Sequence, residues 1–289
     1  MDLAAVLILQ VVSTIATLVL ISIGLAVIFG MMRVINLAHG EFIMLGGYTV
    51  FVATNAGINL WIAMLVLAPL TVGLIGIVVE RLVIRHLYGR MVDTLLASWG
   101  LSLFFVGLIT TIFGNTTTSQ VSAPFGAVRI GAYSISGYDL FLVLMAALIV
   151  AALYGLLRFT KFGLMARGTM QNADMAAALG VNPARVYMIT FGLGAALSGL
   201  AGGLLAPLSA VLPTMGAAFI AKAFITVISG GGAILLGTAS ASALLGTVNT
   251  VATYLTTPVL GEVALLLAAI ILLRLLPRGI TGRFFRRSL

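Results

Sequence analysis

Long apolar stretches separated by short polar breaks dominate this chain. Most of them run for about 20 residues without the strict alternation of a strand, and this pattern predicts transmembrane α-helices rather than the strands of a barrel. The predicted fold class is therefore all-α, a polytopic membrane helix bundle of eight to nine transmembrane helices in a single domain over residues 1–289. We expect spans at residues 5–31, 36–55, 60–80, 94–113, 138–157, 187–207, 218–234, 236–255 and 259–276.

Basic side chains gather in three segments, at residues 81–90, 158–185 and 274–287. Because cytoplasmic loops carry an excess of lysine and arginine, all three segments are expected inside the cell. This assignment requires an odd number of crossings, with the N-terminus outside and the C-terminus inside. The polar segment 115–137, whose one basic residue is Arg129, then faces outward.

Composition narrows the function classes. The chain is 62% hydrophobic and 8% charged, with a mean hydropathy of +1.24, which excludes a soluble domain. The net charge of +8 lies at the ends of apolar segments, so nucleic-acid binding is not expected. The chain has no cysteine, and His39 and Glu41 stand without further ligands nearby in sequence. We therefore expect no metal site, since zinc requires three or four protein ligands.

The expected topology contains an internal symmetry. The group of spans one to four begins outside, the group of spans six to nine begins inside, and the fifth span lies between the two groups. This arrangement predicts an inverted repeat with a substrate route between the halves. Interruptions fall at matching places, around 39–41 in the second span and 222–232 in the seventh. We expect the seventh span to be broken at Gly230-Gly231-Gly232.

A polar hexapeptide, Asn36-Leu37-Ala38-His39-Gly40-Glu41, stands at the head of the second span, where such groups are costly in lipid. One interpretation is structural: His39 and Glu41 lie at the membrane interface and cap the helix, with Glu41 near the positive end of its dipole. Two functional interpretations stay open, a part in substrate passage or gating and a part in proton coupling.

Two further ionisable residues, Lys222 and Glu262, lie inside apolar runs. Snorkelling to the interface is the simpler explanation for Lys222. Glu262 begins the last span and is expected at the interface. The spacing of the two residues gives no support to a salt bridge between them.

The segment 158–187 is too polar to span a membrane and too regular to be disordered. Asp174 to Leu179 predicts a short alanine-rich helix that ends at Gly180 and Pro183. From the residues alone, this helix either docks into a groove of a partner protein or rests on the membrane surface. The small residues of 194–203 predict close packing against another helix.

Residues 230–238 lack the lysine of a phosphate-binding loop and sit in an apolar run, so this chain is not expected to hydrolyse ATP. It is not expected to be an enzyme.

Several stretches together resemble the permease subunits of ATP-driven importers for branched-chain amino acids and for urea, and the resemblance covers nearly the whole chain. Its strongest parts are Gly24-Leu25-Ala26-Val27-Ile28-Phe29-Gly30, Val34 to Phe42, Met175-Ala176-Ala177-Ala178-Leu179-Gly180 and Pro277-Arg278-Gly279.

That resemblance implies a bacterial inner-membrane protein with several partners: a second related permease, two ATP-binding subunits and a periplasmic binding protein. It implies that this chain binds no cofactor and that ATP and magnesium are used by the ATP-binding subunits. It also implies that the short helix of 158–187 couples the permease to an ATP-binding subunit, with the coupling residues Gln171, Asn172, Asp174, Ala177, Ala178, Leu179 and Gly180.

Within the family, segments 93–102, 169–172 and 213–216 look more like urea permeases, whereas Lys222-Ala223-Phe224 looks more like the amino-acid type. We expect urea or a small amide, with branched-chain amino acids close behind, moved by alternating access. The rival is a stand-alone proton-coupled secondary transporter or channel. The residues expected in substrate passage or gating are Asn36, His39, Glu41, Ser98, Thr226, Ser229 and Asn249.

Overall fold

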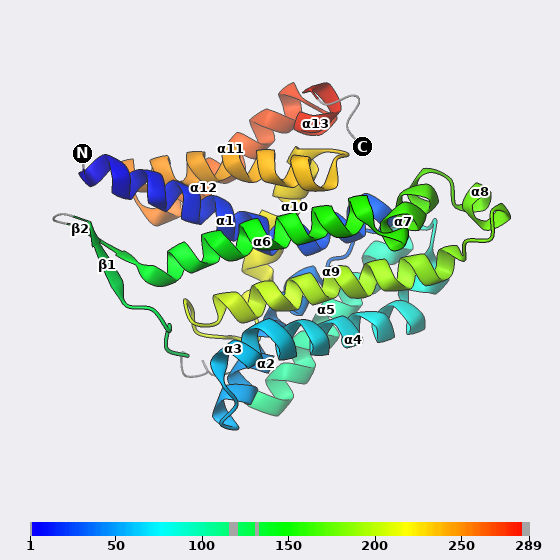
Figure 1. The fold of residues 1–289 in the computed structure, drawn as a ribbon, viewed down its shortest axis with the longest axis horizontal. Coiled ribbons are helices and arrows are strands. Elements are labelled where there is room, and N and C mark those ends of the chain that lie inside the picture. Colours follow the sequence, from blue (N-terminus) through cyan, green and yellow to red (C-terminus); the bar gives the residue numbers. More distant parts are fainter. Residues whose placement is uncertain (1, 116–120, 131–132, 285–289) are drawn as a thin grey trace. The chain divides into compact units, whose positions relative to one another are not determined.

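The computed structural model describes residues 2–115, 121–130 and 133–284. They form a largely helical chain with one small hairpin (Figure 1). The elements are α1 (Asp2–Met32), α2 (His39–Asn55), α3 (Leu60–Ile62), the π-helical turn η1 (Ala63–Leu67), α4 (Ala68–Leu82), the 3₁₀ turn η2 (Ile84–Leu87), α5 (Met91–Phe113), β1 (Ala127–Ile130), β2 (Tyr133–Ser136), α6 (Gly137–Phe159), α7 (Lys161–Gln171), α8 (Ala173–Ala178), α9 (Pro183–Leu205), α10 (Met215–Gly230), α11 (Ile234–Leu255), α12 (Pro258–Leu275) and α13 (Gly279–Phe284).

Seven helices within the described residues are long and apolar enough to cross a membrane, and α10 is a shorter apolar helix. Together with α2, they fit the predicted bundle of eight to nine helices, so the all-α membrane fold class is confirmed. The seven are Ala4–Met32, Leu60–Leu82, Met91–Phe113, Gly137–Phe159, Pro183–Leu205, Ile234–Leu255 and Pro258–Gly282.

The two spans expected to be interrupted are the short helices. α2 has 17 residues and α10 has 16. At about 1.5 Å per residue both are shorter than the roughly 30 Å hydrocarbon core of a bilayer. The chain leaves α10 after Gly230, passes through Gly231 at φ +84° and re-enters a helix at Ile234. The predicted glycine break is therefore confirmed.

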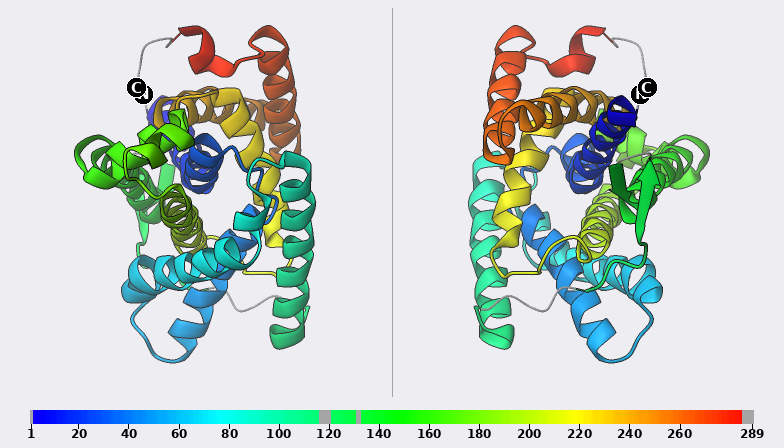
Figure 2. Two further views of the ribbon diagram at one scale, coloured as in Figure 1. Left: turned by 90° about the vertical axis from the view of Figure 1, so that its right-hand side faces the viewer. Right: turned by 90° about the vertical axis from the view of Figure 1, so that its left-hand side faces the viewer.

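Two elements differ from the expectations. Part of the polar segment 115–137 forms the antiparallel hairpin β1–β2, in which Ala127 pairs with Ser136, at the N-terminal end of α6 (Figure 1 and Figure 2). Residues 116–120 and 131–132 of that segment lie outside the described residues. The segment 158–187 contains α7 in addition to the predicted short helix, because Thr160 caps α7 by accepting a hydrogen bond from the Gly163 amide at 3.1 Å.

The helices divide into two compact units. Unit 1 contains residues 1–22, 122–151 and 222–289, and unit 2 contains residues 23–121 and 152–221.

Unit 2 is packed through glycines on α2, α4 and α9. A Cβ atom at Gly202 would come within 1.8 Å of the Ile43 carbonyl oxygen, and one at Gly46 within 2.1 Å of the Gly199 carbonyl oxygen. Backbones this close leave no room for a side chain, which confirms the predicted packing role of residues 194–203. Beside these contacts, the buried ring of Phe42 lies 5.9 Å from that of Phe105 and 6.0 Å from that of Phe191, centroid to centroid.

Unit 1 brings α11 and α12 together with the first part of α1. A Cβ atom at Gly246 would meet the Ile15 backbone at 3.2 Å, so α11 and α1 pack closely there. Near the break after α10, a Cβ at Gly231 would lie 2.6 Å from the Arg278 carbonyl oxygen. The start of α13 therefore packs directly on the glycine break.

Candidate functional site

The break before α2 in unit 2 is held by polar side chains. The Asn36 Oδ1 atom accepts a hydrogen bond from the Ala38 amide at 3.1 Å. Ser98, on α5, accepts one from the Leu37 amide at 3.0 Å, and its hydroxyl lies 3.2 Å from the Ile35 carbonyl oxygen. Both side chains are fully buried. They form hydrogen bonds with backbone groups that lie outside any helix. Irregular backbone at membrane depth requires such partners inside the protein.

His39 is the first residue of α2 and is fully buried. Its Nδ1 atom lies 3.1 Å from the Ser198 hydroxyl on α9, and that hydroxyl lies 2.8 Å from the Gly194 carbonyl oxygen. If Ser198 donates to Gly194, its oxygen is left to accept a proton from His39 Nδ1. This contact fixes the start of α2 on α9.

Glu41 lies in the first turn of α2 with 3% of its surface exposed. Ser102, on α5, is its side-chain hydrogen-bond partner, and its Oε2 atom has no partner among the described residues. The helix begins at His39, three residues after the expected start of the second span at residue 36. Glu41 lies near the positive end of the helix dipole, as the structural interpretation expected. The capping part of that interpretation is wrong, because no side-chain hydrogen bond within the described residues caps α2. The position of the buried His39 and Glu41 at the membrane interface stays a prediction.

The two internal basic segments lie at the same end of unit 2. The ring of Tyr88, which follows η2, lies 4.9 Å from that of Tyr187 in the first turns of α9, centroid to centroid. The Tyr88 hydroxyl donates to the buried Glu80 carboxylate. Burial, with this hydrogen bond as the second cause, raises the pKa of the Tyr88 phenol well above its ordinary value, so the phenol stays protonated and remains a donor.

The short helix predicted at Asp174–Leu179 is present as α8, at the end of α9 where that helix begins (Figure 1). The Asn172 side chain caps it by accepting from the Met175 amide at 2.9 Å. Its C-terminus is a Schellman motif: Gly180, at φ +86°, donates to the Ala177 carbonyl, and the Val181 amide donates to the Ala176 carbonyl. Ala176 is the buried residue that anchors α8. All seven predicted coupling residues are exposed.

Thr226 and Ser229 lie on the part of α10 that belongs to unit 1, and both are fully buried. Their hydroxyl oxygens have no partner among the described residues. Thr281 of α13 lies at the glycine break that follows Ser229. Its hydroxyl donates to the Gly230 carbonyl at 2.6 Å and accepts from the Ala233 amide at 3.3 Å. One hydroxyl thus satisfies backbone groups on both sides of the glycine break.

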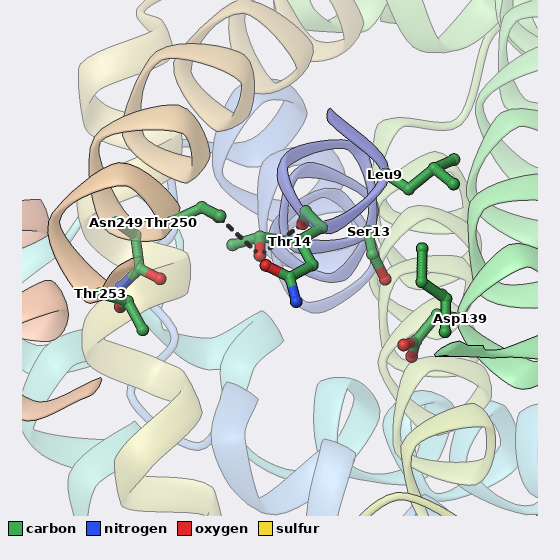
Figure 3. A pocket seen from close by; sticks show the side chains of 9 residues that line it. Leu9, Ser13, Thr14, Asp139, Asn249, Thr250 and Thr253 are labelled. Carbon is green, nitrogen blue, oxygen red and sulfur yellow. Dashed lines mark hydrogen bonds between the residues drawn. The ribbon is translucent and has the colours of Figure 1, made fainter. Parts of the chain in front are cut away.

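Asn249, the remaining candidate, lines a cavity of about 270 Å³ within unit 1 (Figure 3). The walls come from α1, the end of β2, the first turn of α6 and the C-terminal half of α11. The lining residues are Leu9, Gln10, Ser13, Thr14, Ile135, Asp139, Asn249, Thr250 and Thr253.

Lys222 and Glu262 form a salt bridge of 2.6 Å between α10 and α12, with side chains 29% and 46% exposed. The sequence spacing did not predict this pair, because the two residues are 40 positions apart and meet only through helix packing.

The structure groups the predicted pathway residues into two sets. Asn36, His39, Glu41 and Ser98 share the break before α2 in unit 2, whereas Thr226, Ser229 and Asn249 belong to unit 1. Their role in substrate passage stays a prediction. Sequence reasoning missed the cavity, although a signal was present: polar residues recur at helical spacing as Gln10, Ser13 and Thr14 on α1, and as Asn249 and Thr253 on α11.

Comparison with known proteins identifies the family to which this chain belongs. The family model for "Branched-chain amino acid transport system / permease component" matches residues 7–276. The high-affinity branched-chain amino acid transport system permease protein LivH of Escherichia coli strain K12 is 29% identical over 284 residues, which cover 93% of this chain and 92% of that protein. The probable LivH of Methanocaldococcus jannaschii is 28% identical over 283 residues, covering 92% and 88%.

The permease protein BraD of Pseudomonas aeruginosa, also named for high-affinity branched-chain amino acid transport, is 27% identical over 256 residues and covers 78% of this chain and 81% of that protein. No solved structure matches significantly. The family model covers nearly the whole length of the helical bundle, and this chain belongs to the family of branched-chain amino acid transport permease components.

Proposed function

We propose that this chain is a permease subunit of an ATP-binding-cassette importer that passes branched-chain and other hydrophobic amino acids from a binding protein into the cytoplasm. The observation that carries this proposal is the family match over residues 7–276, together with relatives that are named as permeases of high-affinity branched-chain amino acid systems.

The substrate differs from the one that the residue stretches favoured. Segments 93–102, 169–172 and 213–216 suggested urea or a small amide. The relatives above are named for branched-chain amino acids at 27–29% identity. That agreement across three organisms favours the amino acid, and urea becomes the competing substrate to be tested.

The partners follow from the same proposal: a second related permease, two ATP-binding subunits and a periplasmic binding protein, in a bacterial inner membrane with the N-terminus outside. ATP and magnesium are used by the ATP-binding subunits. The location of both internal basic segments at one end of unit 2 supports a common cytoplasmic side for them.

The α8 helix is the proposed docking element for an ATP-binding subunit. It is capped at both ends, and it presents apolar side chains outward: Leu179 is 79% exposed and Met175 is 59% exposed. A six-residue helix is too short to be stable by itself, so the caps and the buried Ala176 are what hold its shape. A rigid projecting helix with exposed apolar residues is suited to transmit a movement.

Reconstitution tests the function. The chain is assembled with its second permease and ATP-binding subunits in proteoliposomes, and uptake of radiolabelled L-leucine and urea is measured with saturating binding protein. We expect leucine uptake that requires ATP. ATP-driven urea uptake without leucine uptake would overturn the substrate. Leucine accumulation by the isolated chain, driven by a pH gradient without ATP, would favour the secondary-transporter rival.

An Ala178→Arg substitution tests the docking role of α8. Ala178 is exposed, so the permease should fold normally while ATP-binding subunits co-purify poorly and ATP-driven uptake is largely lost. Ala56→Arg is the matched control, because Ala56 is also an exposed alanine in unit 2 but lies in the loop between α2 and α3. Normal assembly and uptake in Ala178→Arg would exclude docking at α8.

A further inference from the structure

We propose that the cavity in unit 1 is a binding site for the ammonium group of a zwitterionic amino acid with an apolar side chain, and that Asp139 is the residue that recognises this group. The inference rests on the proposed function, since it assigns a site for the same class of substrate. Neither the family match nor the names of the relatives assign this site.

Three long helices and the hairpin build the cavity. α1 contributes four lining residues, α11 contributes three, and Asp139 stands in the first turn of α6 just after Ile135 of β2. Figure 3 shows Asp139 and Asn249 on opposite sides of the α1 residues Ser13 and Thr14. The volume of about 270 Å³ lies just below the range of roughly 300–1,000 Å³ usual for ligand pockets, so a small solute is the appropriate occupant.

The charge of the lining selects a cation. Asp139 is the one ionisable residue among the nine that line the cavity, and none of the nine is basic. No described residue forms an ion pair or hydrogen bond with its carboxylate. Asp93 offers a direct comparison, because it also occupies the third position of a long apolar helix but is bound by Arg90 in a salt bridge. An acidic residue in a first turn stabilises the helix dipole in both cases. Of these two carboxylates, only that of Asp139 lines a cavity without a salt-bridge partner and is free to bind a ligand.

The polar lining residues fit the rest of a zwitterion. Thr250 donates to Thr14 at 2.9 Å, and Thr14 donates to the Gln10 carbonyl at 3.0 Å, so these two hydroxyls are already committed. The side chains of Gln10, Ser13, Asn249 and Thr253 make no hydrogen bond with the described residues and offer donors for a carboxylate.

Leu9 and Ile135 supply the apolar part of the wall. An ammonium, a carboxylate and a short apolar side chain thus each have a complementary group. A solute with no ammonium lacks the charge partner that Asp139 provides.

Cysteine protection tests the site directly, because the chain has no cysteine of its own. Ser13→Cys places a thiol in the cavity of the assembled importer in nanodiscs without ATP. Its labelling rate by a small thiol reagent is measured on this chain after the subunits are separated. Three probes are compared: L-leucine, 3-methylbutylamine, which lacks the carboxylate, and 4-methylpentanoate, which lacks the ammonium.

We expect L-leucine and 3-methylbutylamine to slow labelling several-fold and 4-methylpentanoate to have no effect. Adding Asp139→Asn should abolish both protections, Asp139→Glu should retain them in part, and Asp93→Asn should leave them unchanged. Equal protection by the amine and the acid, or protection that survives Asp139→Asn, would overturn the role of Asp139.

The two proposals fail in different ways. If the wild-type importer takes up leucine with ATP but none of the probes protects the introduced thiol from labelling, the site is refuted and the function stands. If the amine protects in an Asp139-dependent way but ATP drives no leucine uptake, the site stands and the proposed function is refuted.

Discussion

The two units of this protein differ in how their helices pack. In unit 2, α2, α4 and α9 approach through glycines whose backbones leave no space for a Cβ atom. In unit 1, polar side chains join the elements: Thr14 with Thr250, Lys222 with Glu262, and Thr281 with the break after α10. Unit 1 also contains the polar cavity. Neither kind of contact is exclusive to one unit, since Gly246 of unit 1 closely approaches Ile15 and Ser198 of unit 2 contacts His39. Among the described residues, however, the closest approaches of a glycine to backbone atoms lie in unit 2, so glycine substitutions should damage unit 2 most.

Gly202→Ala is expected to have the largest effect. The new Cβ atom would overlap the Ile43 carbonyl oxygen, which is backbone and has no rotamer to change. Overpacking of this kind costs roughly 3 kcal/mol, the upper end of the usual range, and the folded yield should drop sharply. Thermal unfolding in detergent, followed by size-exclusion chromatography, measures it.

Gly100→Ala is the control for that change. Gly100 is also inside a helix, α5, but no described heavy atom lies within 4 Å of the position that a Cβ atom would take there. It should be neutral or stabilising by up to about 1 kcal/mol, since alanine is the better helix former. Equal effects of the two substitutions would show that close backbone approach does not hold unit 2 together.

Thr281→Val tests the polar link at the glycine break of unit 1. The substitution keeps the shape but leaves the Gly230 carbonyl and the Ala233 amide without the hydroxyl. Because Thr281 is buried, the loss of stability should be about 1–3 kcal/mol. Thr111→Val is the control: its hydroxyl bonds the Gly107 carbonyl of its own helix on an exposed face, so a change near zero is expected. A neutral Thr281→Val would mean that α13 is not needed to hold the break.

The sequence predicted unit 2 better than unit 1, and the reason is physical. Hydrophobic runs, the small residues of 194–203 and the polar break at 36–41 are local signals, and each appears in the structure as expected. The signals for the two ends of α8 were also local. Asn172 is a residue type that favours helix N-caps, and Gly180 is one that favours the positive φ after a helix C-terminus.

The polar links could not be predicted in the same way. Lys222 meets Glu262 across 40 residues, and Thr14 meets Thr250 across 236 residues. Such pairs depend on which helix faces touch, and a single sequence does not specify that. The helical spacing of Gln10, Ser13 and Thr14 indicated a polar face but gave no information about its partner.

Ser198→Ala should have an effect of about 1 kcal/mol, as expected for one buried hydrogen bond. It removes the hydroxyl that lies between His39 and the Gly194 carbonyl while leaving the glycine contacts of unit 2 in place. Unfolding midpoints are compared with those of Ser209→Ala, an exposed serine in the turn that follows α9. An effect as large as that of Gly202→Ala would show that polar contacts govern unit 2 as well.

The smallest effect is expected for the salt bridge between Lys222 and Glu262. Both side chains are partly exposed, and the sequence places them at the membrane interface, where water screens their attraction. A coupling of about 0.2–1 kcal/mol is typical of such pairs. A double-mutant cycle of Lys222→Met, Glu262→Gln and the combined variant measures this coupling, because each single change alone also removes interactions with lipid and solvent. The coupling should fall when salt is raised from about 0.1 to about 1 M, where the Debye length shrinks from roughly 10 to roughly 3 Å. A coupling above about 2 kcal/mol that salt does not change would mean that the pair is shielded from water, and unit 1 would then be held by a buried charge pair.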